Sequence, residues 1–487
     1  MDFFAEKNFV AAALAVFSLT FLVFFPHIYA SIDEHTFLKN ALLLRGGSIS
    51  EQNPELACRS TLFTSQGFVG SQFIGKSIFL LPFTFFGLGA VMLSGLVIHL
   101  INAALFFLIL RRLRIDARFS VLYIFFPVML WESRTLYSEL LVLTAFLAAF
   151  YFYVRETRLG NAASGFLFGL AAIVRYDAAV GFAAFAAPLV FLDRRKLFEM
   201  LAGFTPVVIL ILLFNAFAYS GPLNAGYGSG VSIFSSLINI NPLTLLAYTA
   251  ILLVLVPPGL LASPLLSRKK NYLPQFILIS LAYLWLTSRF TDITAFPLEI
   301  DTLLTARLRY LVPLIGLLLI PYSELMDKIF GRLKVKRNVL FAALLIVLAG
   351  GAVFASSVHA NFTGSRFETF SQIKSSVPQD ALLIGSSDNC IYSITQSLER
   401  TRYMNIVPEY DLGVEGKNIS LSERFSSGTY FMDLGYSNRS SNTSQRQENT
   451  DAERKFMQDF IEGNKETLEP VFETENPNSL SIYRWKG

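Results

Sequence analysis

Two adjacent carboxylates, Asp33 and Glu34, follow a long apolar run by only a few residues. The run extends from Phe9 to Pro26, so the pair lies where a membrane helix would leave the bilayer. Because it is energetically costly to place a charge close to hydrocarbon, an acidic residue at this depth usually has a functional role. A carboxylate here can remove a proton from an incoming hydroxyl. The structural alternative is that Asp33 caps a helix beginning near His35.

Basic and acidic residues recur in other short segments that separate apolar runs. A phosphate needs Arg or Lys as its partner, and Arg supplies forked donor geometry. Beside Asp33 as the candidate catalytic base, the candidate substrate-binding residues are Glu34, Lys76, Arg134, Glu139, Arg175, Tyr227, Arg307 and Arg309. This combination predicts a site for an anionic substrate whose other end is lipid.

Each binding candidate also has an ordinary explanation. Arg175 can extend to the membrane interface and pair with Asp177, and the other basic candidates can be interfacial anchors. Glu139 begins an apolar run, where an acid favours a helix N-terminus. Tyr227 fits an aromatic belt at the membrane interface, and Glu34 can simply face water.

The composition is that of a polytopic membrane protein. The chain has 487 residues, of which 53% are hydrophobic and 16% charged, and its mean hydropathy is +0.50. Soluble domains carry about 25% charged residues. The basic residues are spread over many short loops rather than gathered on one face, which argues against a nucleic-acid partner.

Apolar runs of roughly 20 residues, or fewer where the bilayer thins, predict about eleven transmembrane helices. They cover 8–27, 88–110, 119–132, 138–154, 161–175, 178–192, 198–219, 243–266, 272–287, 310–326 and 338–357. The stretch 73–87 is interrupted by Gly75, Lys76 and Pro82, so we expect a re-entrant or interfacial piece there. A twelfth span at this point would invert everything after it.

Alternate loops carry the basic residues, including Arg111 to Arg114, Arg194 to Lys196 and Lys328 to Arg337. The positive-inside rule places these loops and the N-terminus in the cytoplasm of a multi-pass protein of the cell membrane. We therefore expect a transmembrane catalytic domain over 1–357 and an extracytoplasmic soluble α/β domain over 358–487.

The tail after residue 357 supports this assignment. It contains glycosylation sequons at Asn361, Asn418, Asn438 and Asn442. Strands are expected over 381–385, 428–434 and 479–485, and an amphipathic helix over 452–462. The two cysteines, Cys58 and Cys390, would both lie outside, either as a disulfide or unpaired.

Several segments together resemble the GT-C superfamily of membrane glycosyltransferases, which includes protein O-mannosyltransferases and lipid A aminoarabinose transferases. Asp33-Glu34 resembles its acidic motif after the first span. The similarity continues in the segments Gly75 to Gly87, Ser133 to Glu139, Arg175-Tyr176, Phe214 to Tyr227 and Arg309 to Pro313. The motifs occur in the family's order and on one side of the membrane, and they cover about 1–330.

The resemblance implies a glycosyltransferase of the cell envelope that takes a sugar from a polyprenyl-phosphate-linked donor on the outer face. Asp33 would deprotonate a hydroxyl of a lipid, glycan or protein acceptor, and attack at the anomeric carbon would invert its configuration. Arginines would stabilise the charge on the leaving phosphate. No cofactor is expected, since the four histidines are scattered, although a carboxylate pair can bind a divalent metal.

Two other classes fit part of the pattern. A transporter or flippase of a lipid-linked or anionic substrate would place its polar residues near the bilayer midplane and often contains internal repeats. Here the polar residues cluster toward one face. A non-enzymatic assembly subunit that kept the fold is the third alternative, and the intact Asp33 argues against it.

Overall fold

The computed structural model describes residues 3–486 with internal gaps. The segments outside the description are 54–55, 57–60, 227–240, 291–307, 386–391, 395–397, 406–427, 435–454 and 474–479, with the single residues 30, 256, 269, 334, 401 and 456. Tyr227, Arg307, Cys58, Cys390 and three of the four sequons therefore lie outside the described residues. The fourth, Asn361, is exposed on a helix.

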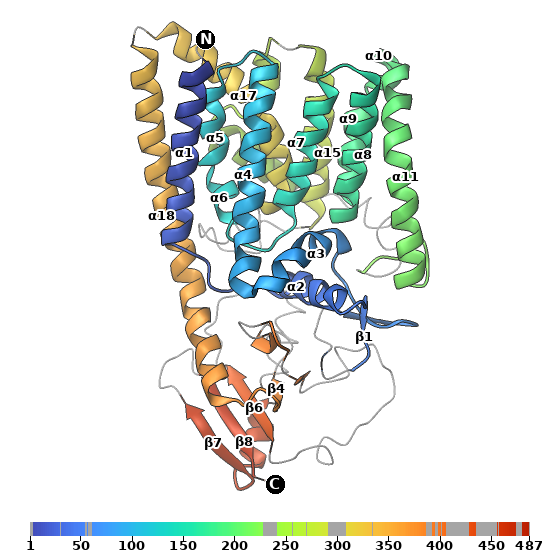
Figure 1. Ribbon diagram of the computed structural model, residues 1–487, viewed down its shortest axis with the longest axis vertical. Coiled ribbons are helices and arrows are strands. Elements are labelled where there is room, and N and C mark those ends of the chain that lie inside the picture. Colours follow the sequence, from blue (N-terminus) through green and yellow to red (C-terminus); the bar gives the residue numbers. More distant parts are fainter. Residues whose placement is uncertain are drawn as a thin grey trace.

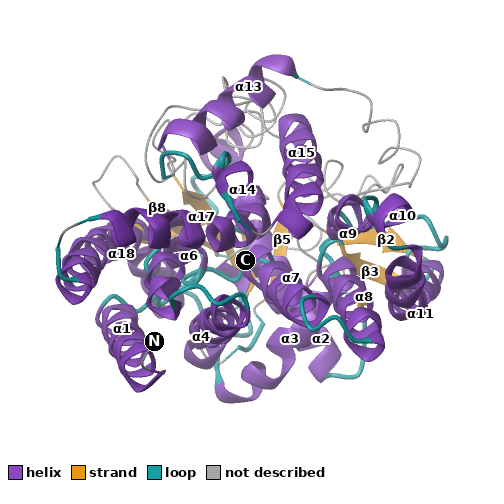
Figure 2. Cartoon of the chain, turned by 90° about the horizontal axis from the view of Figure 1, so that it is seen from above, coloured by secondary structure: helices purple, strands orange, loops and turns teal. Residues whose placement is uncertain are grey.

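A bundle of roughly parallel and antiparallel helices forms the upper part of the molecule (Figure 1). Its long members are α1 (Phe3–Val23), α4 (Leu88–Arg112), α7 (Glu139–Tyr153), α8 (Arg158–Val174), α11 (Arg194–Ala218), α15 (Leu273–Phe290), α17 (Val312–Arg332) and α18 (Arg337–Ser376). Seen from above, α1, α4, α8 and α11 lie along one side of the bundle, and α7 and α17 lie nearer its middle (Figure 2). Among the described residues, five helices are long and apolar enough to cross a membrane.

Several expected spans are built from short helices. The span 119–132 consists of α5 (Ser120–Ile124) and α6 (Pro127–Glu132), because a proline suits the first turn of a new helix. The span 178–192 consists of α9 (Ala178–Ala186) and α10 (Leu189–Leu192). The span 243–266 contains α13 (Pro242–Ala250), a π-helical turn (Ile251–Leu255) and α14 (Ser263–Leu266). The chain is thus a multi-pass membrane protein in which some crossings are interrupted.

Under the bundle lies a layer formed by the first long loop (Figure 1). It contains α2 (Ile32–Arg45), α3 (Ile74–Leu80) and the 3₁₀ helix η2 (Leu81–Phe86). A small antiparallel sheet of order β1-β3-β2 lies beside them, with strands Ser50–Glu51, Gly67–Gly70 and Thr61–Thr64. The expected interfacial piece at 73–87 is thus two short helices that run across the end of the bundle.

The first turn of α2 shows that Asp33 is not a helix cap. The N-cap is Ser31, whose hydroxyl accepts a hydrogen bond from the backbone N–H of Glu34. Asp33 and Glu34 are in the first turn, where carboxylates favour the positive end of the helix dipole. The capping explanation for Asp33 is therefore wrong, and its carboxylate is free to serve other contacts.

The C-terminal part is a five-stranded sheet of order β5-β4-β6-β8-β7. Its strands are β4 (Leu382–Gly385), β5 (Arg402–Asn405), β6 (Thr429–Leu434), β7 (Leu468–Glu473) and β8 (Leu480–Trp485). β4 pairs in parallel with β5 and β6, whereas the β6–β8 and β8–β7 pairs are antiparallel. Three strands and a helix over 457–463 lie where the sequence predicted them.

α18 is longer than the predicted span. It continues without a break for 40 residues and ends at Ser376, well past residue 357. The second half of this helix joins the bundle to the sheet (Figure 1). We retain the domain division at 358 as a proposal, in which that half belongs to the outer domain.

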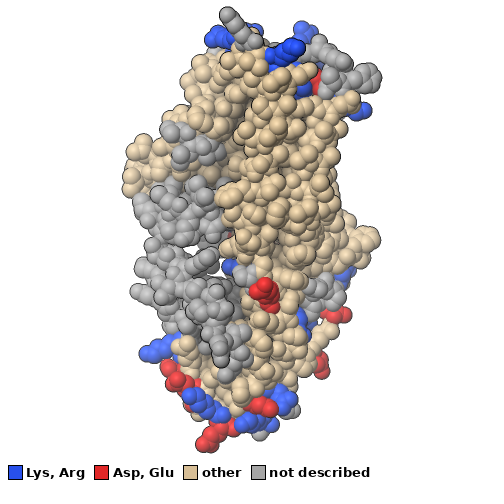
Figure 3. Space-filling view, turned by 90° about the vertical axis from the view of Figure 1, so that its left-hand side faces the viewer, with Lys and Arg blue, Asp and Glu red and all other residues tan. Residues whose placement is uncertain are grey.

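The surface has the charge distribution of a membrane protein. On the face shown in Figure 3, charged side chains gather at the top and over the lower part, with a broad uncharged band between them. The main apolar core fills the bundle, and a second cluster connects α2 with the sheet through Leu38 and Leu383. The layer that contains α2 is thereby packed from both sides.

Candidate functional site

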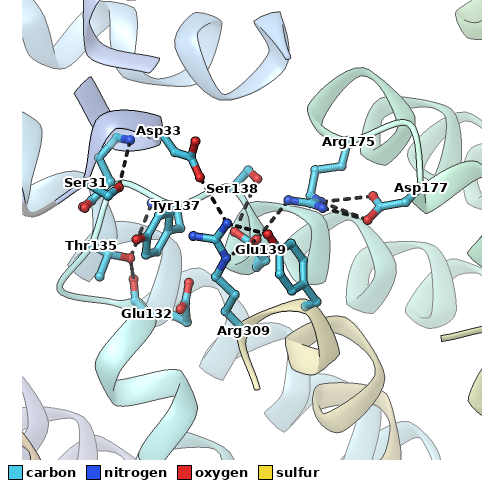
Figure 4. A network of polar contacts seen from close by, with 12 residues as sticks. Ser31, Asp33, Glu132, Thr135, Tyr137, Ser138, Glu139, Arg175, Asp177 and Arg309 are labelled. Carbon is cyan, nitrogen blue, oxygen red and sulfur yellow. Dashed lines mark hydrogen bonds and ion pairs between the residues drawn. The ribbon is translucent and has the colours of Figure 1, made fainter. Parts of the chain in front are cut away.

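The candidate site is a network of charged side chains at the end of the bundle that faces α2. It draws on the first turn of α2, the segment between α6 and α7, the end of α8 and the 3₁₀ turn η8 (Arg309–Leu311). Figure 4 shows Asp33, Tyr137, Glu139, Arg175 and Arg309 directed toward one another. Residues far apart in the sequence thus converge at one level of the molecule.

Arg309 is the centre of this network. Its Nη2 donates to Asp33 Oδ2 at 3.1 Å and to the Tyr310 hydroxyl at 2.7 Å. Asp33 is on α2, whereas Tyr310 is on η8. The Arg309 guanidinium also lies over the Tyr137 ring, 4.2 Å from the ring centre. A guanidinium stacked on an aromatic face and bonded to a carboxylate is held in one orientation.

Glu139 joins the two arginines. It is the first residue of α7 and is buried, with a side chain 2% exposed. Its Oε1 accepts from Arg175 Nη1 at 2.9 Å and lies 3.6 Å from Arg309 Nε. Arg175 ends α8 and also pairs with Asp177, with Nη2 at 2.8 Å from Oδ2. The expected Arg175–Asp177 pair is thus present, and Arg175 is in the network as well.

Asp33 is the most accessible acid of the network. Its side chain is 32% exposed, whereas those of Arg309 and Glu139 are 12% and 2% exposed. Its second oxygen, Oδ1, accepts from Gln72 Nε2 at 2.8 Å. Asp33 therefore combines fixed orientation with access from outside, which a general base requires.

Lys76 and Glu34 are buried beside the network. Lys76 is on α3, and burial lowers the pKa of its ammonium to about 8, although Glu139, Glu132 and Glu34 act in the opposite direction. Glu34 is 1% exposed, and its Oε1 accepts from the backbone N–H of Leu136 at 2.8 Å. Glu34 therefore does not face water; it holds the segment between α6 and α7 against α2.

The structure places Arg134 away from the network. Its guanidinium donates to the backbone carbonyls of Phe24 and Thr20 at the end of α1. The Thr20 carbonyl also accepts from the backbone N–H of Phe24, so the arginine adds a second donor there and supplies a donor to the Phe24 carbonyl at the end of the helix. Arg134 is a structural residue in this arrangement rather than a ligand candidate.

Sequence reasoning did not single out three residues that belong to the site. Tyr310 and Tyr137 flank the Arg309 guanidinium, and burial raises the pKa of the Tyr137 hydroxyl above its ordinary value. Glu132, at the end of α6, is 2% exposed, and neither carboxylate oxygen has a hydrogen-bond partner among the described residues. The position of Tyr310 next to Arg309 was a usable signal, and Glu132 lies in the same polar segment as Arg134 and Glu139.

The described residues contain no group of three or more His, Cys, Asp or Glu side chains that could hold a metal ion. The geometry offers one accessible carboxylate beside fixed guanidinium groups. Such a site can accept a proton and can stabilise negative charge on an oxyanion.

No protein-family model and no curated protein matches the chain. Among solved structures, ArnT from Cupriavidus metallidurans in the apo state matches with a TM-score of 0.62 at 11% identity. That match covers 99% of this chain and 99% of the ArnT chain. ArnT from the same organism bound to undecaprenyl phosphate matches with a TM-score of 0.59 at 12% identity, covering 98% and 97% of the two chains. The chain therefore shares the fold of these ArnT structures over nearly its whole length.

Proposed function

We propose that this chain is an integral membrane glycosyltransferase that uses a polyprenyl-phosphate-linked sugar as its donor. The observation that carries the proposal is the direct contact of an accessible carboxylate, Asp33, with the buried arginine Arg309. The shared fold with an ArnT structure that holds undecaprenyl phosphate supports the donor class.

In the proposed reaction Asp33 is the general base. It takes the proton of the acceptor hydroxyl as that oxygen attacks the anomeric carbon of the sugar. The bond between the anomeric carbon and the phosphate oxygen breaks, and the polyprenyl phosphate leaves with the electron pair. Attack from the face opposite the phosphate inverts the anomeric configuration.

The basic residues stabilise the leaving group. The phosphate gains negative charge as it leaves, and fixed cations near it lower the barrier. Arg309, Arg175 and Lys76 are the candidates for this role, because they flank Glu139 and lie at the level of Asp33. Glu139 orients the two guanidinium groups, and we assign it that role in place of direct binding.

We further propose that the site and the C-terminal domain face the outside of the cell membrane and that the N-terminus is cytoplasmic. The basic loops Arg111 to Arg114 and Arg194 to Lys196 support this orientation through the positive-inside rule. The exposed sequon at Asn361 supports it as well. A reporter inserted after Arg366 that proves cytoplasmic would overturn it.

The decisive experiment compares wild type with Asp33→Asn. Purified protein in proteoliposomes is supplied with undecaprenyl-phosphate sugars and with cell-envelope extract as the source of acceptors, and sugar transfer is followed by mass spectrometry. A general base contributes about 10²- to 10⁴-fold, so the variant should retain donor binding and lose transfer by that factor. Asp459→Asn, which removes an exposed carboxylate of the C-terminal domain, is the matched control.

Two outcomes would contradict the proposal. Transfer by Asp33→Asn at the wild-type rate would remove Asp33 from the mechanism. Movement of the intact sugar lipid across the proteoliposome membrane by wild type, without any transfer, would instead establish the transporter alternative.

A further inference from the structure

The turn 70–72 links the last strand of the small sheet, β3, to α3 and contacts the candidate base. Gln72 is 4% exposed, and its Nε2 donates to Asp33 Oδ1 at 2.8 Å. Arg309 donates to the other oxygen, Oδ2, at 3.1 Å. Each oxygen of the Asp33 carboxylate is therefore held by a donor from a different part of the chain.

The turn is itself held by the loop 219–226, which follows α11. The buried Tyr219 hydroxyl donates to the carbonyl of Gly70 at 2.9 Å. Gly226 lies so close to the turn that a Cβ there would come within 1.9 Å of the Ser71 carbonyl oxygen. Side chains larger than hydrogen are excluded at this position unless the backbone moves.

The loop is closed by its own hydrogen bonds. Asn224 donates from Nδ2 to the carbonyl of Tyr219 at 3.0 Å and from its backbone N–H to the carbonyl of Gly221 at 3.0 Å. α11 therefore ends in a compact loop that presents Tyr219 and Gly226 to the same three-residue turn. β3 in turn packs against α2, which carries Asp33.

From this geometry we infer that the loop 219–226 and the turn 70–72 form a positioning clamp for the Asp33 carboxylate, with Gln72 as its contact residue. The inference rests on the proposed function of Asp33 as a base. Gln72 is a positioning residue: it fixes the direction of the carboxylate and does not touch the sugar or the phosphate.

A neutral amide suits this position for a physical reason. The amide Nε2 of Gln72 donates to Asp33 Oδ1 without placing a second charge beside the carboxylate. A carboxylate at residue 72 would repel Asp33 and favour its protonated form. Gln72 also continues to hold Asp33 when a phosphate competes for Arg309.

The test is the pH dependence of transfer by Gln72→Glu and Gln72→Ala. Like charges in contact shift a pKa by about one unit or more, so the acidic limb of kcat/KM for Gln72→Glu should move upward by at least that amount. Gln72→Ala should lower kcat about tenfold or more, since a misplaced catalytic group reacts slowly, and should leave the donor KM unchanged. Gln275→Glu is the matched control, because Gln275 is a buried glutamine that donates to Tyr153 at 3.3 Å, away from the site.

Labelling of Asp33 by dicyclohexylcarbodiimide, read by mass spectrometry over a pH series, provides a second readout that needs no acceptor. The reagent reacts with protonated carboxyl groups, so labelling of Gln72→Glu should persist to a higher pH than labelling of wild type. If both readouts for Gln72→Glu match those of Gln275→Glu, the clamp does not act on Asp33 and the inference is overturned.

Tyr219→Phe and Gly226→Ala test the contacts between the loop 219–226 and the turn 70–72. Tyr219→Phe removes one hydrogen bond and keeps the ring, so the protein should fold, with a reduced kcat and an unchanged donor KM. Gly364→Ala is the control for the glycine, because a Cβ there meets no atom within 4 Å. If wild type transfers sugar and Tyr219→Phe retains full kcat, the clamp is contradicted and the proposed function is not. If wild type does not transfer sugar, the proposed function itself is contradicted.

Discussion

Replacing Glu139 by glutamine should expose how much the site depends on one buried carboxylate. Glu139 lies between two guanidinium groups, at 2.9 Å from Arg175 Nη1 and 3.6 Å from Arg309 Nε. The substitution keeps the size of the side chain and removes its charge. Arg175 then retains Asp177, and Arg309 retains Asp33, but the two cations face each other across a neutral group.

The magnitude follows from the burial of this carboxylate. Removing one partner of a buried ion pair costs about 3–5 kcal/mol where the other charge is left uncompensated, and this range is the upper limit here because each arginine keeps a second carboxylate. With an unfolding entropy of about 2.1 cal/mol/K per residue and 487 residues, the whole chain has roughly 1 kcal/mol/K. The loss in Tm should therefore be at most about 3–5 °C.

The assay is thermal unfolding in detergent, with Glu199→Gln as the matched control. Glu199 also contacts two arginines, Arg195 and Arg158, but these pairs are at the exposed start of α11, so its loss should change Tm little. Undecaprenyl phosphate binding supplies a second readout. Removal of the negative charge between two arginines should strengthen binding of the lipid phosphate while transfer slows. Equal Tm values for the two variants would refute the argument that Glu139 holds the arginines in place.

Three further predictions concern the surroundings of the site. Burial lowers the pKa of Lys39 to about 7 from 10.5, so its protonated form destabilises the fold below pH 7 and this cost is relieved as the pH rises toward 10.5. The Tm of wild type should thus rise relative to Lys39→Met across that window, and parallel curves would contradict the assignment. In Gly75→Ala the new Cβ would lie 2.8 Å from the backbone of α8, so α3 must shift and the rate of sugar transfer should fall. Gly89→Ala is the control and should behave as wild type, because a Cβ there meets nothing within 4 Å. Glu34→Gln replaces a charged acceptor of the Leu136 N–H by a neutral one and should lower the free energy of chemical unfolding by about 1 kcal/mol. Glu34→Ala should lower it further. An unchanged unfolding midpoint for both variants would count against this contact.

The sequence predicted the elements of the bundle because hydrophobic runs report on membrane crossings directly. It located three strands of the C-terminal sheet, and it placed the acids and arginines of the site at one membrane face. It did not predict where α18 ends. Hydropathy falls after residue 357, but a helix needs no apolar environment to continue into water, so the polarity change and the helix end are separate events.

The contacts of the site were beyond sequence reasoning for a different reason. Asp33 and Arg309 are 276 residues apart, and their pairing depends on how α2 packs under the bundle. Gln72 follows a short strand and carries no charge, so nothing marked it as a partner of Asp33. Arg134 looked like its neighbours in sequence, yet its direction into the end of α1 separates it from them.

The position of Arg309 has a consequence for the order of events in the proposed reaction. One guanidinium nitrogen, Nη2, donates to Asp33, while the same side chain is a candidate to contact the donor phosphate. The phosphodiester of such a donor carries one negative charge, as a carboxylate does, and its oxygens can accept forked hydrogen bonds from arginine. Donor binding should therefore compete with Asp33 for the Arg309 guanidinium and release Asp33 Oδ2 for the acceptor hydroxyl. Gln72, which bonds the other oxygen, would keep the carboxylate in place during this exchange, so the two contacts of Asp33 have different tasks.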